Sequence, residues 1–205
     1  SELVHRYSLL SACEPDIRSA FSILIATFKS GGKVLVCGNG GSAADSEHIV
    51  GELMKSFRFK RPLDPEFVKS YQSVNNCEVP PFLEGAVPVL SLVSHTALMS
   101  AIGNDTSADG IFAQQVYGYG NAGDALLAIS TSGLSANVIE AAKVARAKEL
   151  KTIVLTGDQD TDLTRMSDVS IRVPETETYA VQEYHLPVYH CLCAMVEAGI
   201  FGDTK

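Results

Sequence analysis

Short apolar segments alternate with longer amphipathic ones along most of this chain. Apolar runs of strand length occupy 33–37, 87–93, 125–129 and 152–155, with a weaker one at 169–173. Apolar residues recur at helical spacing in 42–56, about 108–118, 134–149 and 179–198. Strands that are apolar throughout and separated by helices are typical of a parallel sheet covered on both faces. The pattern therefore predicts an α/β fold with a doubly wound, five-stranded parallel sheet of the flavodoxin type.

Two regions lie outside this alternation. In 1–30, apolar residues at helical spacing are divided by Pro15, so we expect two helical stretches, the second from near Asp16 to Gly31-Gly32. The region 57–86 is rich in proline, has one helical stretch near 64–73, and includes most of a basic cluster, Lys55, Arg58, Lys60 and Arg61. We interpret it as an insertion that could cover a site, or as a solvated loop. Residues 1–205 are expected to form one domain, with 1–30 as an N-terminal helical layer.

The composition argues against several classes of protein. The 205 residues carry a formal net charge of −8, whereas a nucleic-acid surface needs a basic footprint. No apolar run reaches the roughly 20 residues of a bilayer span, and Ser1 opens into a helical pattern rather than a leader peptide. The five cysteines are odd in number and mostly in apolar surroundings, which is typical of reduced thiols. We expect a cytoplasmic protein with neither a membrane nor a nucleic-acid partner.

Glycines and hydroxyl residues directly follow two of the predicted strands. In Cys37-Gly-Asn-Gly-Gly-Ser42, glycines let the backbone turn its N–H groups toward a ligand. The loop lacks the GxGxxG pattern of a dinucleotide site, and a tight turn without a ligand is the simpler interpretation. Ser130-Thr-Ser-Gly-Leu-Ser135 carries four hydroxyls where helix capping needs one. Hydroxyls and free helix N–H groups can hold a phosphate, so two such loops at one sheet edge favour a phosphorylated polyol.

One predicted helix carries a pair of residues that can bind a metal. His48 and Glu52 are four residues apart, which places both side chains on one helix face. A His and a Glu at this spacing are more often a surface pair than two ligands. The spacing alone therefore leaves both interpretations open.

The last helix offers a second set of candidate ligands. Gln182 and His185 share a face, whereas Gln182 and His190 lie about 80° apart on an ideal helix. Periodicity alone favours His185 as the partner of Gln182. Pro187 precedes His190, however, and a proline inside a helix bends it at a cost of about 3 kcal/mol.

Taken in order, these motifs resemble those of the phosphoheptose (sedoheptulose 7-phosphate) isomerases of the sugar-isomerase, or SIS-domain, family. The resemblance extends from about residue 16 to the end, apart from the insertion at 57–86. The matching segments are Cys37-Gly-Asn-Gly-Gly-Ser42, His48-x-x-x-Glu52, Gly103-Asn-Asp105, Ser130-Thr-Ser-Gly-x-Ser-Ala-Asn137 and Gln182-Glu-x-His-x-x-x-x-His190.

The resemblance implies a site for one zinc ion per subunit and for one sugar phosphate. The implied metal ligands are His48, Glu52, Gln182 and His190, with His190 in place of the His185 that periodicity favours. The implied phosphate contacts are Ser130, Thr131, Ser132 and Ser135. The implied sugar contacts are Asn39, Gly40, Gly41, Ser42, Asn104, Asp105 and Gln182. The family also implies a homotetramer with sites at subunit interfaces.

The implied reaction is a ketose–aldose isomerisation. It converts sedoheptulose 7-phosphate to D-glycero-D-manno-heptose 7-phosphate, a precursor for lipopolysaccharide or surface glycans. A base must move a proton between C1 and C2, and an acid must serve the oxygens; we expect Glu52 and His190 in these catalytic roles. The alternative is a non-catalytic SIS-domain protein, either a sugar-phosphate binder or a replication-initiation associated protein, which has no need of four metal-competent side chains. An isomerase of a hexulose or pentulose phosphate is a third interpretation.

Two positions depart from the family pattern. The family has an arginine one turn after the metal glutamate, where this chain has Ser56 and the nearest substitute is Arg58. The family also has an acid shortly before the metal glutamine, where this chain has Tyr179-Ala-Val181. Basic residues of the insertion, Arg58, Lys60 and Arg61, are the candidates for supplying the missing groups.

Overall fold

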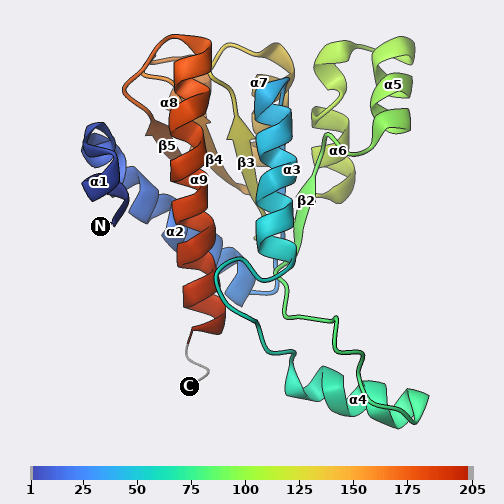
Figure 1. The fold of residues 1–205 in the computed structure, drawn as a ribbon. Coiled ribbons are helices and arrows are strands. Elements are labelled where there is room, and N and C mark those ends of the chain that lie inside the picture. Colours follow the sequence, from blue (N-terminus) through green and yellow to red (C-terminus); the bar gives the residue numbers. More distant parts are fainter. Residues whose placement is uncertain (1, 203–205) are drawn as a thin grey trace.

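A computed structural model gives the structure of the protein and describes residues 2–202 (Figure 1). Its sheet has five strands in the order β2-β1-β3-β4-β5, with every neighbouring pair parallel. This is the flavodoxin-type doubly wound order, so the predicted fold class is confirmed. The strands are β1 (Val34–Gly38), β2 (Val89–Ser91), β3 (Ala125–Ile129), β4 (Lys151–Thr156) and β5 (Val169–Arg172).

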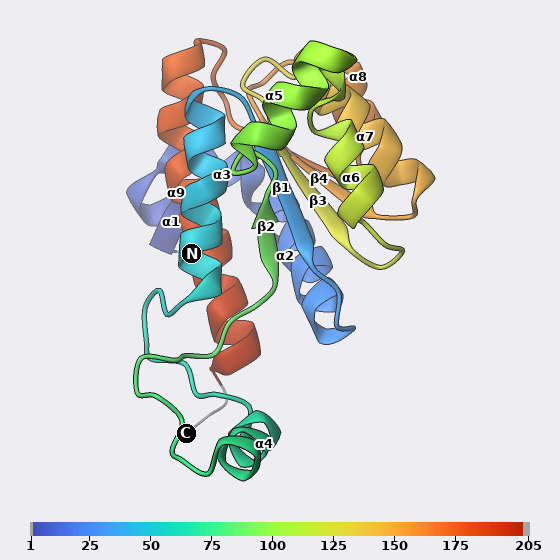
Figure 2. The ribbon, with the colours of Figure 1, turned by 90° about the vertical axis from the view of Figure 1, so that its right-hand side faces the viewer.

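Helices cover both faces of the sheet (Figure 2). Successive side chains of a strand point to opposite faces, so Val34 and Val36 of β1 join one core cluster while Leu35 and Cys37 join the other. The first face is covered by α1 (Glu2–Arg6), the 3₁₀ turn η1 (Ser8–Cys13), α2 (Glu14–Lys29), α3 (Gly41–Met54) and α9 (Thr178–Phe201). The other side carries α5 (Thr96–Asp105), the 3₁₀ turn η2 (Ala108–Gly110), α6 (Ala113–Tyr119), α7 (Ala136–Ala147) and α8 (Asp162–Met166).

The N-terminal layer differs in detail from the prediction. Pro15 lies in the first turn of α2, where a missing N–H costs no intrahelical hydrogen bond. The preceding stretch is not one helix but α1 followed by η1, with Tyr7 between them. No helix within residues 2–202 is both long enough and apolar enough to cross a membrane.

The insertion at 57–86 forms an arm that projects from the domain (Figures 1 and 2). Its helix α4 (Pro65–Asn75) has no buried residue. The arm begins after α3, whose 14 residues carry the chain about 20 Å from the carboxyl end of β1. The arm thus projects away from the carboxyl end of β1, whereas Phe57 at the start of the insertion lies beside His190.

Candidate active site

The two predicted loops meet at the carboxyl edge of the sheet. β1 and β3 are neighbours, with Gly38 paired to Ile129 at their ends, so the loops that follow them start side by side. Asn39 Nδ2 donates to Asn137 Oδ1 at 2.9 Å, and Asn137 Nδ2 donates to Asn39 Oδ1 at 3.0 Å. This reciprocal amide pair ties the glycine loop to the start of α7.

The serine loop is shaped to receive an anion. Ser135 directly precedes α7, yet its hydroxyl makes no cap to the helix backbone and instead lies 3.1 Å from Ser130 Oγ. Ser132 Oγ accepts from Leu134 N at 3.2 Å. Gly133 has a φ of +68°, and a Cβ there would lie 2.7 Å from Thr161 Oγ1, so this turn requires glycine. The hydroxyls and the first-turn N–H groups of α7 together offer donors to a phosphate.

Gln182 of α9 packs on the glycine loop. A Cβ on Gly41 would lie 2.5 Å from Gln182 Nε2, so a larger residue at position 41 would displace this amide from the loop. His190 lies eight residues further along α9, about 12 Å along the helix axis. The structure therefore places Gln182 beside the glycine loop, about two helical turns before His190.

His48 and Glu52 face each other on α3. His48 Nε2 lies 3.0 Å from Glu52 Oε1, and their side chains are 42% and 16% exposed. The second ring nitrogen, His48 Nδ1, lies 2.9 Å from the hydroxyl of Tyr189 on α9. The pair is therefore joined to the neighbouring helix and is not simply a solvated surface contact.

His190 brings a third donor to this pair. Its ring lies 5.0 Å from the His48 ring, between centroids and nearly perpendicular, and 5.5 Å from the Phe57 ring. Burial and the nearby His48 lower the pKa of His190, while Glu52 opposes that shift. The Nε2 atom of His190 is buried and has no hydrogen-bond partner. Such a nitrogen beside a second imidazole and a carboxylate has the donor chemistry of a Zn²⁺ site.

The side chains of His48, Glu52 and His190 are of types that bind a metal, although their donor atoms do not surround one common position. Within residues 2–202, no three His, Cys, Asp or Glu side chains form a ready metal centre. His48 and Glu52 instead contact each other directly. The zinc site thus remains a prediction that rests on the unpartnered nitrogen of His190.

His185, the partner that periodicity favours for Gln182, lies in the core. It is fully buried, and neither ring nitrogen forms a hydrogen bond of normal geometry. Burial lowers the pKa of His185 to about 4, partly opposed by the backbone of Thr156. The structure thus places His190, not His185, beside His48.

The buried His185 predicts a loss of stability in acid. Between its ordinary pKa of 6.5 and its folded pKa of about 4, the unfolded chain binds a proton that the folded chain does not. The free energy of unfolding should fall as pH decreases through this window, by up to about 3 kcal/mol. Urea unfolding of wild type and His185→Leu from pH 7 to about pH 4 measures it, with the exposed His5→Leu as control. An equal acid loss in wild type and His185→Leu would contradict the prediction.

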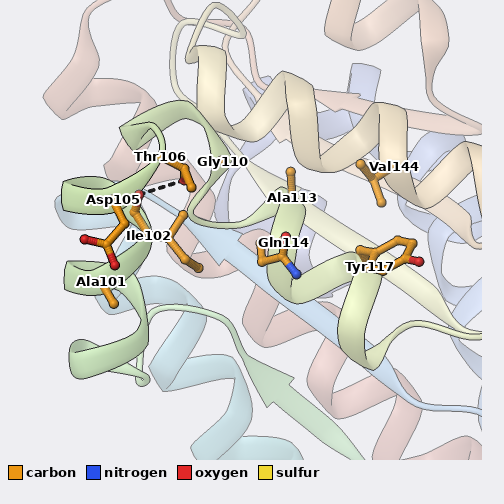
Figure 3. Close-up of a pocket in the computed structure, with 9 residues that line it drawn as sticks. All are labelled: Ala101, Ile102, Asp105, Thr106, Gly110, Ala113, Gln114, Tyr117 and Val144. Carbon is orange, nitrogen blue, oxygen red and sulfur yellow. Dashed lines mark hydrogen bonds between the residues drawn. The ribbon is translucent and has the colours of Figure 1, made fainter.

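Asn104 and Asp105 lie at the end of α5, on the other side of the sheet. Asn104 Nδ2 donates to Asp105 Oδ1 at 2.7 Å. Asp105 lines a cavity of about 460 Å³ whose other walls come from α5, the segment between α5 and α6, α6 itself and Val144 of α7 (Figure 3). Among the described residues, none from the glycine or serine loops lines this cavity. The cavity beside Asp105 is thus separate from the glycine and serine loops, and the sugar contacts of Asn104 and Asp105 stay predictions.

The positions that depart from the family pattern have partners of their own. Ser56 donates from N and Oγ to Glu84 Oε2 of the arm, at 2.9 and 2.5 Å. The exposed Arg58 lines a groove of about 800 Å³ that also includes His190. Arg61 is fully buried against Glu197, so the expectation that Arg61 supplies a missing group is wrong.

Sequence reasoning missed two residues that contact the site. Tyr189 is 1% exposed and occupies one of the apolar positions of the last helix, so the sequence pattern does not distinguish it from a core residue. Asp45 accepts from the Tyr189 hydroxyl at 3.2 Å. Its position three residues before His48, on the same helix face, is the one signal that could have pointed to it.

The fold and the paired loops define an SIS-domain protein. A family model of the SIS domain matches residues 7–87 and 71–157. The phosphoheptose isomerase of Chromohalobacter salexigens is 37% identical over 194 residues, covering 93% of this chain and 87% of that protein. That of Rhodospirillum rubrum is 38% identical over 191 residues, covering 93% and 89%.

Solved structures agree with the sequence relatives. A phosphoheptose isomerase from Francisella tularensis superimposes with a TM-score of 0.78 at 32% identity, covering 93% of this chain and 90% of that one. The corresponding structure from Neisseria gonorrhoeae gives 0.76 at 30% identity, covering 96% and 94%. The chain belongs to the phosphoheptose isomerase family, as its motifs predicted.

Proposed function

We propose that the protein interconverts sedoheptulose 7-phosphate and D-glycero-D-manno-heptose 7-phosphate with one Zn²⁺ per subunit. The family relationship supports the isomerase activity and the heptose substrate. The single observation that carries the metal is the buried, unpartnered Nε2 of His190 next to His48 and Glu52. The product is a precursor for lipopolysaccharide or surface glycans, and we place its synthesis in the cytoplasm.

The chemistry is assigned to the α3–α9 pair. His48, Glu52 and His190 hold the metal, which when bound supplies a Lewis acid for the sugar carbonyl. Glu52 takes a proton from C1 of the ketose and returns one to C2. His190 gives a proton to the oxygen on C2 and takes one from the oxygen on C1. The C2 carbonyl thereby becomes a C1 aldehyde with no net change in protons.

The remainder of the substrate is assigned to the two loops. The phosphate binds the serine loop and the first turn of α7, while Asn39, Gly40, Gly41 and Gln182 contact sugar hydroxyls. From Gly41 to His48 the chain advances about 10 Å along α3. The loop that contacts sugar hydroxyls and the residues assigned to C1 chemistry are therefore separated along α3, as an extended sugar phosphate requires.

Removing one hydroxyl of the serine loop tests the phosphate assignment. Ser132→Ala should raise the KM for sedoheptulose 7-phosphate by about 10- to 100-fold, because one charge-assisted hydrogen bond contributes about 1.5–3 kcal/mol. Zinc content should stay unchanged. Ser70→Ala, on the exposed surface of α4, is the control. An unchanged KM and kcat would mean that the phosphate binds elsewhere.

Assembly is the second part of the proposal. We assign the protein to a homotetramer with sites at subunit interfaces. The groove beside His190 supports it, because apolar side chains of α9 and charged side chains of α1 and α2 line an open surface next to the catalytic histidine. The arm also presents Phe67 and Val74 of α4 to solvent, at 43% and 79% exposure.

Metal analysis followed by turnover separates the candidate functions. The proposal expects one Zn²⁺ per chain, and conversion of sedoheptulose 7-phosphate with exchange of a C1 hydrogen in heavy water. A non-catalytic SIS protein would bind sugar phosphate without exchange. Faster turnover of a hexulose or pentulose phosphate would instead assign a shorter substrate.

A further inference from the structure

A buried tyrosine connects the two helices of the candidate active site. Tyr189 lies on α9 directly before His190 and is 1% exposed. Its hydroxyl lies 2.9 Å from His48 Nδ1 and donates to Asp45 Oδ1 at 3.2 Å. Its ring meets the rings of His48 and His190 edge-on, with centroids 5.5 and 5.0 Å away. The packing thus fixes the hydroxyl between the two polar groups of α3.

The direction of these hydrogen bonds follows from counting protons. A phenol has one hydrogen, and an ionised carboxylate can only accept. The Tyr189 hydroxyl donates to Asp45 Oδ1 at 3.2 Å, and Asp45 Oδ2 is buried without a hydrogen-bond partner. The phenol oxygen can then only accept from His48, so the hydrogen of the neutral imidazole lies on Nδ1.

This arrangement determines what the other ring nitrogen offers. With the hydrogen on Nδ1, Nε2 of the neutral His48 carries a lone pair. Nε2 lies 3.0 Å from Glu52 Oε1, which also carries lone pairs. Two acceptors at this separation repel each other unless a proton or a cation joins them. Histidine ligands are commonly held in one tautomer by such a bond to the nitrogen that does not bind the metal.

We propose that Asp45 and Tyr189 are positioning residues that hold His48 in its Nδ1–H form and so present Nε2 to a divalent cation shared with Glu52. The inference rests on the zinc part of the proposed function. It assigns a role to a residue pair that touches neither the metal nor the substrate.

We call the hydrogen bonds that join Asp45, Tyr189 and His48 the relay. Two variants, together with one measurement that does not depend on metal, test it. Tyr189→Phe removes the hydroxyl and keeps the ring. Tyr184→Phe, a half-buried tyrosine earlier on α9, is the matched control. Nitrogen-15 NMR of the metal-free protein, at alkaline pH where histidines are neutral, reports the tautomer of His48. We expect Nδ1–H in wild type and Tyr184→Phe, and a shift toward Nε2–H in Tyr189→Phe.

Zinc affinity is the second measurement. Competition with a chromophoric chelator should show binding weaker by about 10- to 100-fold in Tyr189→Phe and unchanged in Tyr184→Phe. An Nε2–H tautomer in wild type, or equal Zn²⁺ affinity in Tyr189→Phe and wild type, would overturn the relay alone. Absence of Zn²⁺ binding by wild type would overturn both the relay and the zinc part of the proposed function, so the two failures are distinguishable.

Discussion

Glu52→Gln should slow isomerisation by about 10²- to 10⁴-fold, the usual contribution of a general base. Glutamine keeps the length of the side chain and one oxygen that can bind a metal. The variant should therefore fold and bind substrate. An amide cannot accept the C1 proton, so the loss falls on the chemical step. Zinc affinity is expected to decrease as well, because a negative ligand is lost.

Two rates measured on zinc-saturated protein separate chemistry from metal loss. They are kcat for sedoheptulose 7-phosphate and exchange of the C1 hydrogen in heavy water, and both should fall together. Glu47→Gln, on an exposed position of α3, is the matched control. If both rates in Glu52→Gln stay near those of wild type, Glu52 is at most a ligand and another group is the base.

Arg61→Met should destabilise the folded chain by about 3–5 kcal/mol, because it leaves a buried charge without its partner. Arg61 Nε donates to Glu197 Oε1 at 2.8 Å, and both side chains are 0% exposed. The two terminal nitrogens of Arg61 donate to the carbonyls of Leu53 and Glu52, at 2.6 and 2.7 Å. One side chain thus binds the end of α3 to α9.

Glu197 also depends on this contact. Its carboxylate accepts from the backbone N–H groups of Phe57 and Arg58 at 2.7 and 2.8 Å. Burial alone would raise the pKa of Glu197, but the hydrogen bonds from Phe57, Arg58 and Arg61 outweigh it and keep the pKa below its ordinary value. Without Arg61, the carboxylate keeps its backbone donors and loses its cation.

Urea unfolding at neutral pH measures the effect, with the exposed Arg58→Met as control. Arg61→Met combined with Glu197→Leu should lose less stability than the sum of the two single variants, since an apolar pair can replace a buried ion pair. A midpoint for Arg61→Met equal to that of the control would contradict the assigned role.

The sequence predicted the sheet well because the central strands β1 and β3 are buried on both faces. β3 was predicted residue for residue, as an unbroken apolar run bounded by polar residues. The helices α5 and α8 were missed. α8 has five residues, too few for a helical period to emerge, and α5 contains Gly103 and presents few core residues. In both cases tertiary packing, rather than local pattern, decides the structure.

The sequence predicted several residues of the candidate site but not the contacts between them. Loop composition pointed to the glycine and serine loops, and helical spacing pointed to His48 and Glu52. The bond between Asn39 and Asn137 joins residues 98 apart, which no local pattern reveals. Arg61 was grouped with its basic neighbours because sequence does not show that Glu197, 136 residues later, lies against it.

The two ends of the arm are hydrogen-bonded to each other where the arm meets the domain. Gly85 N donates to Arg61 O at 3.3 Å, and Glu84 accepts from Ser56, so the chain leaves and returns at one point. Extending a loop whose ends are already fixed costs only about 0.6 kcal/mol for each doubling of its length. Chain length between 62 and 84 is thus nearly uncoupled from folding of the sheet and its helices. Insertions and deletions can accumulate in this segment over evolution, so the arm can acquire or lose a binding specificity while the catalytic scaffold is inherited unchanged.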